Sequence, residues 1–380
     1  MSIKIIIGAD IVPTKSNYDL FINSETQKLA DSMILNLLKN ANYRIFNLEV
    51  PLTNIKSPIK KCGPNLIAPC ETVKGIKAIG ANLLCIANNH ILDQGSEGFK
   101  STVRTLESNG INYVGGGKLG EASKPFYFSI DKKTIGVYAC AEHEFSIATE
   151  DKEGANPFEP LESLDHIAKM KSECDYIICL YHGGKEHYRY PSPYLQKVCR
   201  KIVEKGANLV ICQHSHCIGC EEHYQSGHIV YGQGNFIFDH QNNDFWATSL
   251  LIEVEYKEGD IKENINYYPI CKSGNSIRSA TPVEAQKIMD DFNYRSQQIK
   301  NKHYICQEYE KFSQTMVGFY ILTSHYFFNT RIFHAINKLT GNRLQSSIGK
   351  LVARKCRYRM RNYLECEAHR ELFITGLNAK

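Results

Sequence analysis

The sequence predicts a layered α/β domain followed by a basic helical segment, and three observations indicate this. Over the first 280 residues, short apolar runs of strand length alternate with amphipathic stretches of helical length. A helix-start signal follows near Ser279, and no strand-like alternation recurs beyond it. Several apolar runs end in carboxylate, amide or imidazole side chains, as is typical of the edge of an α/β sheet that carries a site.

Eight apolar runs form the predicted strands. They are rich in β-branched, leucine and aromatic residues, and polar or turn residues bound them. In chain order the runs are KIIIG (4–8), YRIFNLE (43–49), NLLCIAN (82–88), TIGVYAC (134–140), DYIICLYH (175–182), NLVICQH (208–214), HIVYGQGNFIF (228–238) and SLLIEVEY (249–256).

Amphipathic stretches between these runs predict helices at 71–81, 98–110 and 192–208, the last with Pro193 in its first turn and Gly206 at its end. After the strands, the sequence from Thr281 to Glu284 (TPVE) reads as a capping box that opens a long helix. We therefore expect an α/β domain over residues 1–280 and a basic helical extension over residues 281–380.

The composition excludes several classes of protein. With 380 residues, 43% hydrophobic and 22% charged, the chain is neither disordered nor fibrous. Its 14 cysteines are too sparse for a disulfide scaffold, and most lie in apolar runs, which predicts reduced, buried thiols. The first residues lead directly into a β-branched run and lack the features of a signal peptide, which predicts a cytoplasmic protein.

The net charge of +5 is concentrated near the end of the chain, where residues 331–380 hold eleven Lys and Arg against three Glu. This segment is either a solvated helical face or a surface for an anionic partner or membrane lipid, which would make the protein membrane-peripheral. Residues 312–330 are uncharged but contain several polar side chains, so we expect a buried or interfacial helix and no transmembrane helix.

Polar side chains follow five of the predicted strands. Because the carboxyl ends of parallel strands meet at one edge of a sheet, we expect these side chains to lie together. A single histidine at a strand end is usually structural, but five strands in succession favour a shared site. The residues are Asp10, Asn47, Glu49, Asn88, Asn89, His90, His182, His214 and His216.

This set of ligand atoms suits a divalent metal ion. Carboxylate, amide and imidazole groups without a thiolate are compatible with Mn²⁺, Fe²⁺, Zn²⁺ or Mg²⁺. In a tight turn, His214 and His216 could reach two adjacent ions, and a bridging carboxylate could hold two ions roughly 3.5–4 Å apart. His90 would then lie where it can act as a general acid.

Seven motifs follow one another in the sequence: GAD (8–10), NLEVPLT (47–53), ANNHILDQGSEG (87–98), GGG (115–117), HGGKE (182–186), QHSH (213–216) and GNFIFD (234–239). In this order, over roughly residues 3–275, they resemble the CapA family, which is named for poly-γ-glutamate capsule synthesis. That family is similar to the calcineurin-like metallophosphoesterases. The resemblance implies a four-layer α/β/β/α sandwich, one or two divalent metal ions and phosphoesterase-type hydrolysis.

The resemblance also implies a role for each residue of the site. Asp10 matches the first-strand metal ligand, and Glu49 stands where the superfamily has a bridging aspartate. The remaining metal ligands are Asn89, His182, His214 and His216, and His90 is the catalytic acid. Residues expected to support the ligands or contact the substrate are Asn47, Asn88, Asp93, Glu186 and Asn235.

Two departures from the superfamily pattern affect the proposed chemistry. Asp10 is followed by Ile11 and Val12 instead of the Asp-x-His pattern, so one imidazole is missing and a first ion would bind weakly or not at all. Gln213 replaces the glycine that precedes the closing histidine pair. A separate zinc site at Cys217 and Cys220 is disfavoured because no second CxxC motif accompanies them.

Two main functions compete. One is a metal-dependent hydrolase of a phosphoester or related bond, linked to capsule or cell-envelope polymer metabolism. The alternative is a non-catalytic capsule assembly factor that binds an anionic polymer such as poly-γ-glutamate at the same site. A nucleic-acid enzyme is a weaker third hypothesis that rests only on the basic segment.

Overall fold

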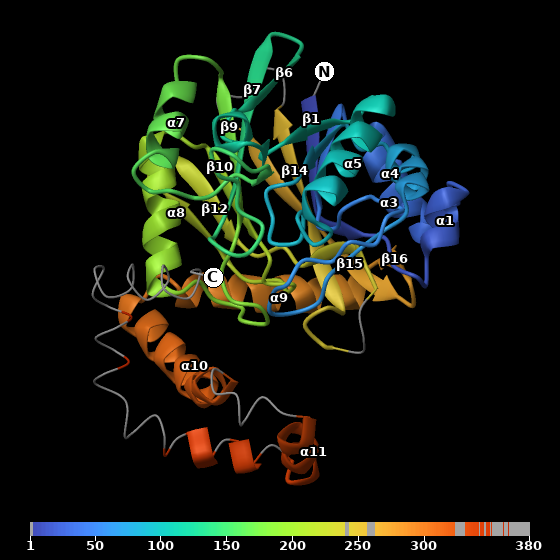
Figure 1. Cartoon of the computed structure of the whole chain (residues 1–380). Helices are drawn as coiled ribbons and strands as arrows, with labels where there is room; N and C mark the ends of the chain where they lie inside the picture. The colour runs from blue at the N-terminus through green and yellow to red at the C-terminus, as the bar shows by residue number, and fades with distance from the viewer. Residues whose placement is uncertain are drawn as a thin grey trace. The chain divides into compact units, whose positions relative to one another are not determined.

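The computed structural model describes residues 3–239, 243–256, 263–323, 331–341, 343–345, 347–349, 351, 360 and 364. The chain divides into two compact units, Met1–Ile305 and Cys306–Lys380. In the first unit, two β-sheets pack face to face, and helices cover the outer face of each sheet (Figure 1).

The first sheet has eight strands. Seven lie in the order β16-β15-β14-β1-β2-β3-β4, and β13 pairs with the end of β1. Strands β1 to β4 are parallel, and β14 to β16 extend the sheet by antiparallel pairing. The strands are β1 (Ile3–Val12), β2 (Tyr43–Leu48), β3 (Leu83–Cys85), β4 (Asn112–Val114), β13 (Asn235–Phe238), β14 (Thr248–Tyr256), β15 (Asn264–Ser273) and β16 (Ser276–Ser279).

The second sheet has six strands in the order β11-β12-β10-β9-β7-β6. Its four central strands are parallel, and the edge strands β11 and β6 are antiparallel to their neighbours. A separate small sheet pairs β5 (Gly116–Gly117) with β8 (Gly154–Ala155). The six strands are β6 (Phe126–Ile130), β7 (Lys133–Ala141), β9 (Tyr176–His182), β10 (Leu209–Gln213), β11 (Glu221–Tyr224) and β12 (Gly227–Tyr231).

All eight predicted apolar runs are strands, and one of them forms two. The run from 228 to 238 forms β12 and β13, which belong to different sheets. Gly232 and Gly234 separate these strands with φ angles of 102° and 83°, a left-handed backbone conformation that favours glycine. The sequence did not predict the shorter or more polar strands, including β4, β11, β15 and β16.

Alternation of side chains along the strands creates the layers. Ile5 and Ile7 of β1 face the second sheet and join one core with Ile178 and Leu180, whereas Ile6 faces the helices on the outer side. Strands that are buried on both faces read as continuous apolar runs, as these do. The four-layer α/β/β/α sandwich is therefore confirmed.

Helices cover the two outer faces (Figure 1). The first sheet is covered by α1 (Tyr18–Ile22), α2 (Thr26–Leu29), α3 (Ser32–Asn40), α4 (Val73–Ile79) and α5 (Gly95–Ser108), and the second by α7 (Ser163–Met170) and α8 (Pro193–Lys205). Two short elements, a 3₁₀ helix (Cys70–Thr72) and α6 (Leu119–Ala122), lie in the connections. Helix α8 begins and ends as expected, because the Ser192 side chain accepts a hydrogen bond from the Leu195 N–H and Gly206 ends the helix.

Helix α9 (Pro282–Gln298) belongs to the first unit, so the structure places the division later than the expected boundary at residue 281. The predicted capping box between Thr281 and Glu284 is present. However, Phe292 of α9 is fully buried against the sandwich, and Ile299 joins the core beneath α8. The helix therefore completes the core of the first unit.

The second unit contains most of α10 (Lys302–Thr323) and all of α11 (Arg331–Leu339). No helix among the described residues is both long and apolar enough to cross a lipid bilayer. Part of the expected helix over 312–330, and all of the basic residues after 350, lie outside the described residues.

Candidate metal centre

The carboxyl ends of five strands bring the predicted metal ligands together. Asp10 lies near the end of β1, Glu49 follows β2, and Asn89 follows β3. His182 is the last residue of β9, and two further histidines follow β10. All six predicted ligands are less than 9% exposed: Asp10, Glu49, Asn89, His182, His214 and His216.

Local backbone irregularities direct these side chains into the site. The pairing of β1 with β2 shifts register between Ile7 and Asp10, a bulge of the kind that re-aims side chains beside functional sites. His214 and His216 have φ angles of 91° and 53°, in the left-handed region that is unusual for residues with a Cβ. The two rings lie 5.9 Å apart on the same side of this turn, as the sequence predicted for a tight turn.

Two groups of ligand atoms share Glu49. In the first group, ligand atoms of Asp10, Glu49 and His216 lie within 4.8 Å of one another. In the second, the same holds for Glu49, His182 and His214. Nε2 of His182 lies 3.2 Å from Oε1 of Glu49 and 3.0 Å from Oδ1 of Asn89, which places the Asn89 amide beside the second group.

Four buried atoms at the centre form no hydrogen bond of good geometry with any described residue. They are Oδ2 of Asp10, both carboxylate oxygens of Glu49 and Nδ1 of His214. A buried polar atom without a partner costs about 1–3 kcal/mol. Divalent cations bind to such carboxylate and imidazole atoms, so the residues present fit one or two metal ions.

The charges of these groups are strongly linked. Burial alone would raise the pKa of Glu49, but the charges of His216 and His182 lower it. Burial opposes the charged form of His216, but Glu49 and Asp10 raise the pKa of this imidazole to about 9. Burial and the neighbouring His182 lower the pKa of His214, and burial together with Glu49 raises the pKa of Asp10.

Asn47 and Asn88 support Asp10, the predicted metal ligand on the first strand, and are not themselves predicted metal ligands. Nδ2 of Asn47 donates a hydrogen bond of 2.7 Å to Oδ1 of Asp10. Nδ2 of Asn88 in turn donates to Oδ1 of Asn47 at 3.0 Å and to the Leu48 carbonyl at 2.8 Å. This chain of amides orients Asp10, which agrees with the supporting role expected for both residues.

Asp93 holds the ring of His90. Nδ1 of His90 lies 2.6 Å from Oδ2 of Asp93, and this oxygen also accepts a 2.6 Å hydrogen bond from the Leu66 N–H. Lys61, whose side chain is only 3% exposed, forms an ion pair with Asp93 and was not predicted from the sequence. Asp93 therefore fixes one nitrogen of the His90 ring.

Glu144 is a second residue that the sequence analysis missed. Its Oε2 accepts a 3.3 Å hydrogen bond from Nδ2 of Asn89, and its Oε1 lies 3.9 Å from Nε2 of His214. Glu144 follows β7 at the same edge of the second sheet at which β9 ends in His182. It stands three residues beyond the end of β7, so a search limited to strand ends did not find it.

The remaining predicted residues lie around His216 and His214. Oδ1 of Asn235 lies 2.8 Å from Nδ1 of His216, and the Trp246 ring stacks on His216 with centroids 4.3 Å apart. Glu186 is exposed, and one of its oxygens lies within 4.8 Å of ligand atoms of His214 and His216. Gln213, which replaces the usual glycine, donates to the Gly8 carbonyl at 3.4 Å and so links the two sheets.

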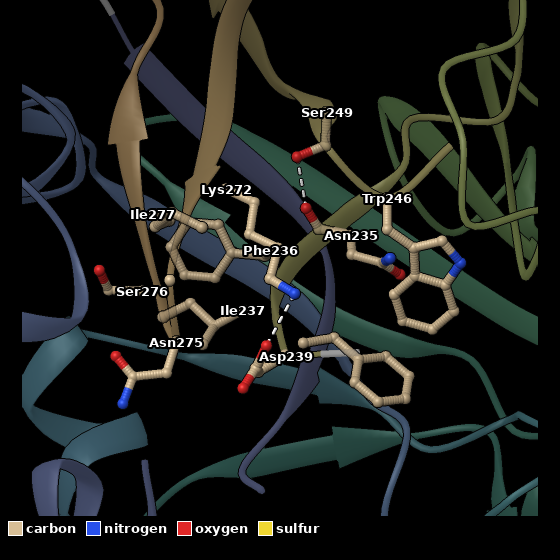
Figure 2. Close-up of a pocket in the computed structure, with 12 residues that line it drawn as sticks. Asn235, Phe236, Ile237, Asp239, Trp246, Ser249, Lys272, Asn275, Ser276 and Ile277 are labelled. Atoms are coloured by element: carbon tan, nitrogen blue, oxygen red, sulfur yellow. Dashed lines mark hydrogen bonds and ion pairs between the residues drawn. The ribbon is translucent and has the colours of Figure 1, made fainter. Parts of the chain in front are cut away.

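Figure 2 shows the residues that line a pocket, among them Asn235 and Trp246. Ser249 donates a hydrogen bond to the Asn235 carbonyl, and Nζ of Lys272 lies 2.7 Å from Oδ1 of Asp239. These contacts hold β13 in place, and β13 positions Asn235 against His216. Cys217 and Cys220, by contrast, are buried free thiols that belong to no candidate metal group among the described residues.

Comparison with known proteins relates the chain to capsule synthesis. It is 32% identical over 213 residues to "Capsule biosynthesis protein CapA" of Bacillus anthracis, covering 53% of this chain and 52% of that protein. It is 28% identical over 272 residues to "PGA biosynthesis protein CapA" of Bacillus subtilis (strain 168), covering 69% of each. The matched region thus spans about half the length of the first relative.

Among solved structures, a phosphatase from Mycoplasma pneumoniae superimposes with a TM-score of 0.45 at 14% identity, covering 75% of this chain and 97% of that one. Residues 7–240 match the family described as "Bacterial capsule synthesis protein PGA_cap". This region contains every site residue that the sequence predicted, from Asp10 to Asn235. The chain therefore belongs to the bacterial capsule synthesis (PGA_cap) family.

Proposed function

We propose that this chain is a metal-dependent hydrolase of the phosphoesterase type that acts in capsule or cell-envelope polymer metabolism. The observation that carries the proposal is Glu49, which belongs to both ligand groups while neither carboxylate oxygen accepts a well-formed hydrogen bond from a described residue. A carboxylate between two ion positions is what two-metal hydrolytic sites require. Membership of the capsule synthesis family supports the link to an envelope polymer.

In this proposal, Asp10, Glu49 and His216 hold one divalent ion. A second ion is held by Glu49, His182 and His214, with the amide oxygen of Asn89 nearby. Oxygen and nitrogen donors without thiolate suit Mn²⁺, Fe²⁺, Zn²⁺ or Mg²⁺. A bound divalent ion would polarise the oxygen of the scissile bond and lower the pKa of a water molecule in the site.

His90 acts as the general acid. The carboxylate of Asp93 holds Nδ1 of the ring, so Nε2 is the nitrogen that can give a proton to the leaving group. Lys61 pairs with the same carboxylate and limits the negative charge that Asp93 presents to the ring. The fixed ring orientation is what a positioned acid needs, because proton transfer requires the donor and acceptor in hydrogen-bond reach.

The substrate class that we propose is a phosphoester or an anionic polymer of the poly-γ-glutamate type. We further propose that the protein acts in the cytoplasm and that its basic C-terminal helices meet an anionic partner or a membrane surface. The family description supports the polymer, and the eleven Lys and Arg among the last 50 residues support the anionic partner.

A second function, binding of the polymer without hydrolysis, is favoured by one observation. Val12 occupies the place of the superfamily's first imidazole and is 1% exposed within the core. The first ion position therefore has three protein ligands, Asp10, Glu49 and His216, which would weaken an ion there. A protein with one firmly held ion could recognise carboxylates or phosphates without cleaving them.

The first experiment is metal analysis of the purified full-length protein, followed by a screen of phosphomonoesters, phosphodiesters and γ-glutamyl peptides. We expect stoichiometric metal after incubation with Mn²⁺ and hydrolysis of at least one substrate class. Absence of metal after this incubation would contradict the hydrolase. Bound metal with γ-glutamyl peptide binding but no hydrolysis would support the second function.

Two variants then separate the roles within the site. Replacing His90 with Asn should keep the metal content and lower turnover by roughly 10²–10⁴-fold, the usual share of a positioned acid. Replacing His182 with Ala should lower metal content and turnover together. His303→Asn, at an exposed residue of α10, is the matched control and should change neither. Loss of metal from the His90 variant would make His90 a ligand.

A further inference from the structure

A second cavity, which shares no residue with the metal ligand groups, lies against helix α9. Its volume is about 270 Å³, just below the range of roughly 300–1,000 Å³ that is typical of small-molecule sites. Three cationic side chains line it: Arg189, which follows β9, and Lys287 and Arg295 of α9. We call it the arginine cavity.

The two arginines are held side by side. Nη1 of Arg189 donates a 2.9 Å hydrogen bond to the carbonyl of Ile218, and Nε of Arg295 donates a 2.7 Å bond to the carbonyl of Gly219. Because the acceptors belong to consecutive residues, the guanidinium groups are neighbours. The Arg189 guanidinium also lies over the Phe245 ring, 5.0 Å from its centroid, which fixes its plane.

The guanidinium groups of Arg189 and Arg295 are not neutralised by ion pairs with described carboxylates. Neither forms an ion pair with a carboxylate of any described residue, although Glu284 and Asp291 also line the cavity. Glu284 is engaged by two hydrogen bonds of 2.7 Å from Arg278 and by the capping box of α9. Burial, and then the charge of Arg189, lower the pKa of Arg295, and the smaller opposing effect of Asp291 does not cancel them.

We propose that the arginine cavity binds a phosphate group, either as inorganic phosphate or as a phosphate monoester. Each guanidinium uses one N–H donor for its backbone carbonyl and keeps others for a ligand. A planar carboxylate fits the fork of one arginine, whereas the oxygens of a tetrahedral phosphate can accept from two forks at once. Lys287 adds a third positive charge, and Thr248 also lines the cavity.

The arginine cavity lies close to the metal centre along the chain but does not depend on it. Ile218 and Gly219 follow His216 by two and three residues, and Phe245 precedes the Trp246 that stacks on His216. The same two segments therefore support a metal ligand on one side and the arginines on the other. The proposal holds whether or not the metal centre hydrolyses a substrate.

The experiment is isothermal titration of the full-length protein with inorganic phosphate. Arg189→Gln and Arg295→Gln should each weaken phosphate binding about tenfold or more, because each removes a charge-assisted hydrogen bond. Arg104→Gln, at an exposed arginine of α5, is the matched control and should leave the affinity unchanged. His182→Ala, which disrupts the metal centre, should also leave it unchanged.

Two further variants keep the test decisive if a glutamine variant does not fold. Arg189→Lys and Arg295→Lys retain the charge but lose the planar fork, and we expect weaker phosphate binding with the thermal transition preserved. Retention of phosphate binding in all the arginine variants, or its loss in His182→Ala, would place the phosphate at the metal centre and overturn the proposal. Absence of binding to the wild-type protein, or tighter binding of acetate than of phosphate, would overturn it as well.

Discussion

Two clusters of histidine and glutamate in this protein have similar composition but differ in how their carboxylates are hydrogen-bonded. At the edge of the second sheet, Nε2 of His228 lies 2.6 Å from Oε2 of Glu221, and the Tyr267 hydroxyl donates to the same oxygen. At the metal centre, Nε2 of His182 lies 3.2 Å from Oε1 of Glu49, and no hydroxyl or backbone N–H of a described residue satisfies that carboxylate. We call the first the edge cluster.

The difference shows how a structural cluster and a ligand-ready cluster can be distinguished. The edge cluster leaves one buried atom without a hydrogen bond, Nδ1 of His228, whereas the candidate metal ligands leave four, two of which have only an imidazole nitrogen 3.2–3.5 Å away. Buried polar atoms normally form hydrogen bonds, so several buried atoms that form none and converge on one place fit a cation site. Residue type alone would not separate the two clusters, although Glu221 is partly exposed and Glu49 is fully buried.

Removal of α9 should have the largest effect, and it should act on the edge cluster first. The Ser296 hydroxyl of α9 accepts a hydrogen bond from the Glu221 N–H, and Phe292 packs against Tyr267 with ring centroids 5.0 Å apart. A fragment of residues 1–280 also loses the buried Ile299 and Ile305. At about 1.5–3 kcal/mol for each large apolar side chain, the loss is comparable to the whole stability of a domain.

We therefore expect the 1–280 fragment to be insoluble or to unfold without a cooperative transition, and the 1–305 fragment to unfold cooperatively. Circular dichroism during thermal melting measures both. A cooperative, wild-type-like transition for the 1–280 fragment would show that α9 is dispensable and would restore the boundary expected from the sequence.

Paired substitutions of the two glutamates test the comparison directly. Glu49→Gln should weaken metal binding more than about 100-fold, since even loss of an outer partner of a ligand costs roughly 10–100-fold. Glu221→Gln should leave metal binding unchanged and lower the free energy of unfolding by about 1–3 kcal/mol, because a charged acceptor of two hydrogen bonds is lost. Chelator competition and urea unfolding measure the two quantities. Equal metal loss in both variants would remove the distinction.

The sequence predicted which residues gather at the candidate metal centre because local rules position most of them. Asp10, His182 and the histidines after β10 lie at the ends of apolar runs, and the ends of parallel strands meet at one edge. The layers were also predictable, because runs such as KIIIG bury both faces of a strand. In each case the pattern lies within a few consecutive residues.

The residues that were missed depend on contacts between distant segments. Lys61 reaches Asp93 across 32 positions, Glu144 reaches Asn89 across 55, and Trp246 stacks on His216 across 30. The role of α9 was missed for the same reason. Its capping box was readable, but Phe292 is buried against Ile218, Leu250 and Tyr267, which lie far from it in the sequence, and β15, which carries Tyr267, was not recognised as a strand. Only the folded chain shows these pairs.

We expect the affinity of the candidate metal centre for a divalent ion to rise with pH. This pH dependence is a second property by which it can be distinguished from the edge cluster. In the metal-free protein Glu49 and Asp10 outweigh burial and raise the pKa of His216 to about 9, so this imidazole is protonated at pH 7. A metal ligand must be neutral, so binding releases a proton, and affinity should increase about tenfold for each pH unit between 6.5 and 8.5. Titration calorimetry in buffers of different ionisation enthalpy measures the proton. Affinity that is constant over this range would exclude His216 as a ligand.

The smallest expected effect concerns Glu144, which touches the metal centre without joining either group around Glu49. A glutamine at this position can still accept the hydrogen bond from Asn89, so Glu144→Gln should change metal affinity less than about threefold. Glu144→Ala removes the acceptor and should weaken metal binding about tenfold, the lower end of the range for outer partners. Glu150→Ala, at an exposed residue of the same loop, is the control for both. The glutamine variant could instead lose as much metal affinity as the alanine variant. In that case the charge of Glu144 acts on the ion through His214, whose Nε2 lies 3.9 Å from Oε1 of Glu144, and Glu144 belongs with the ligands.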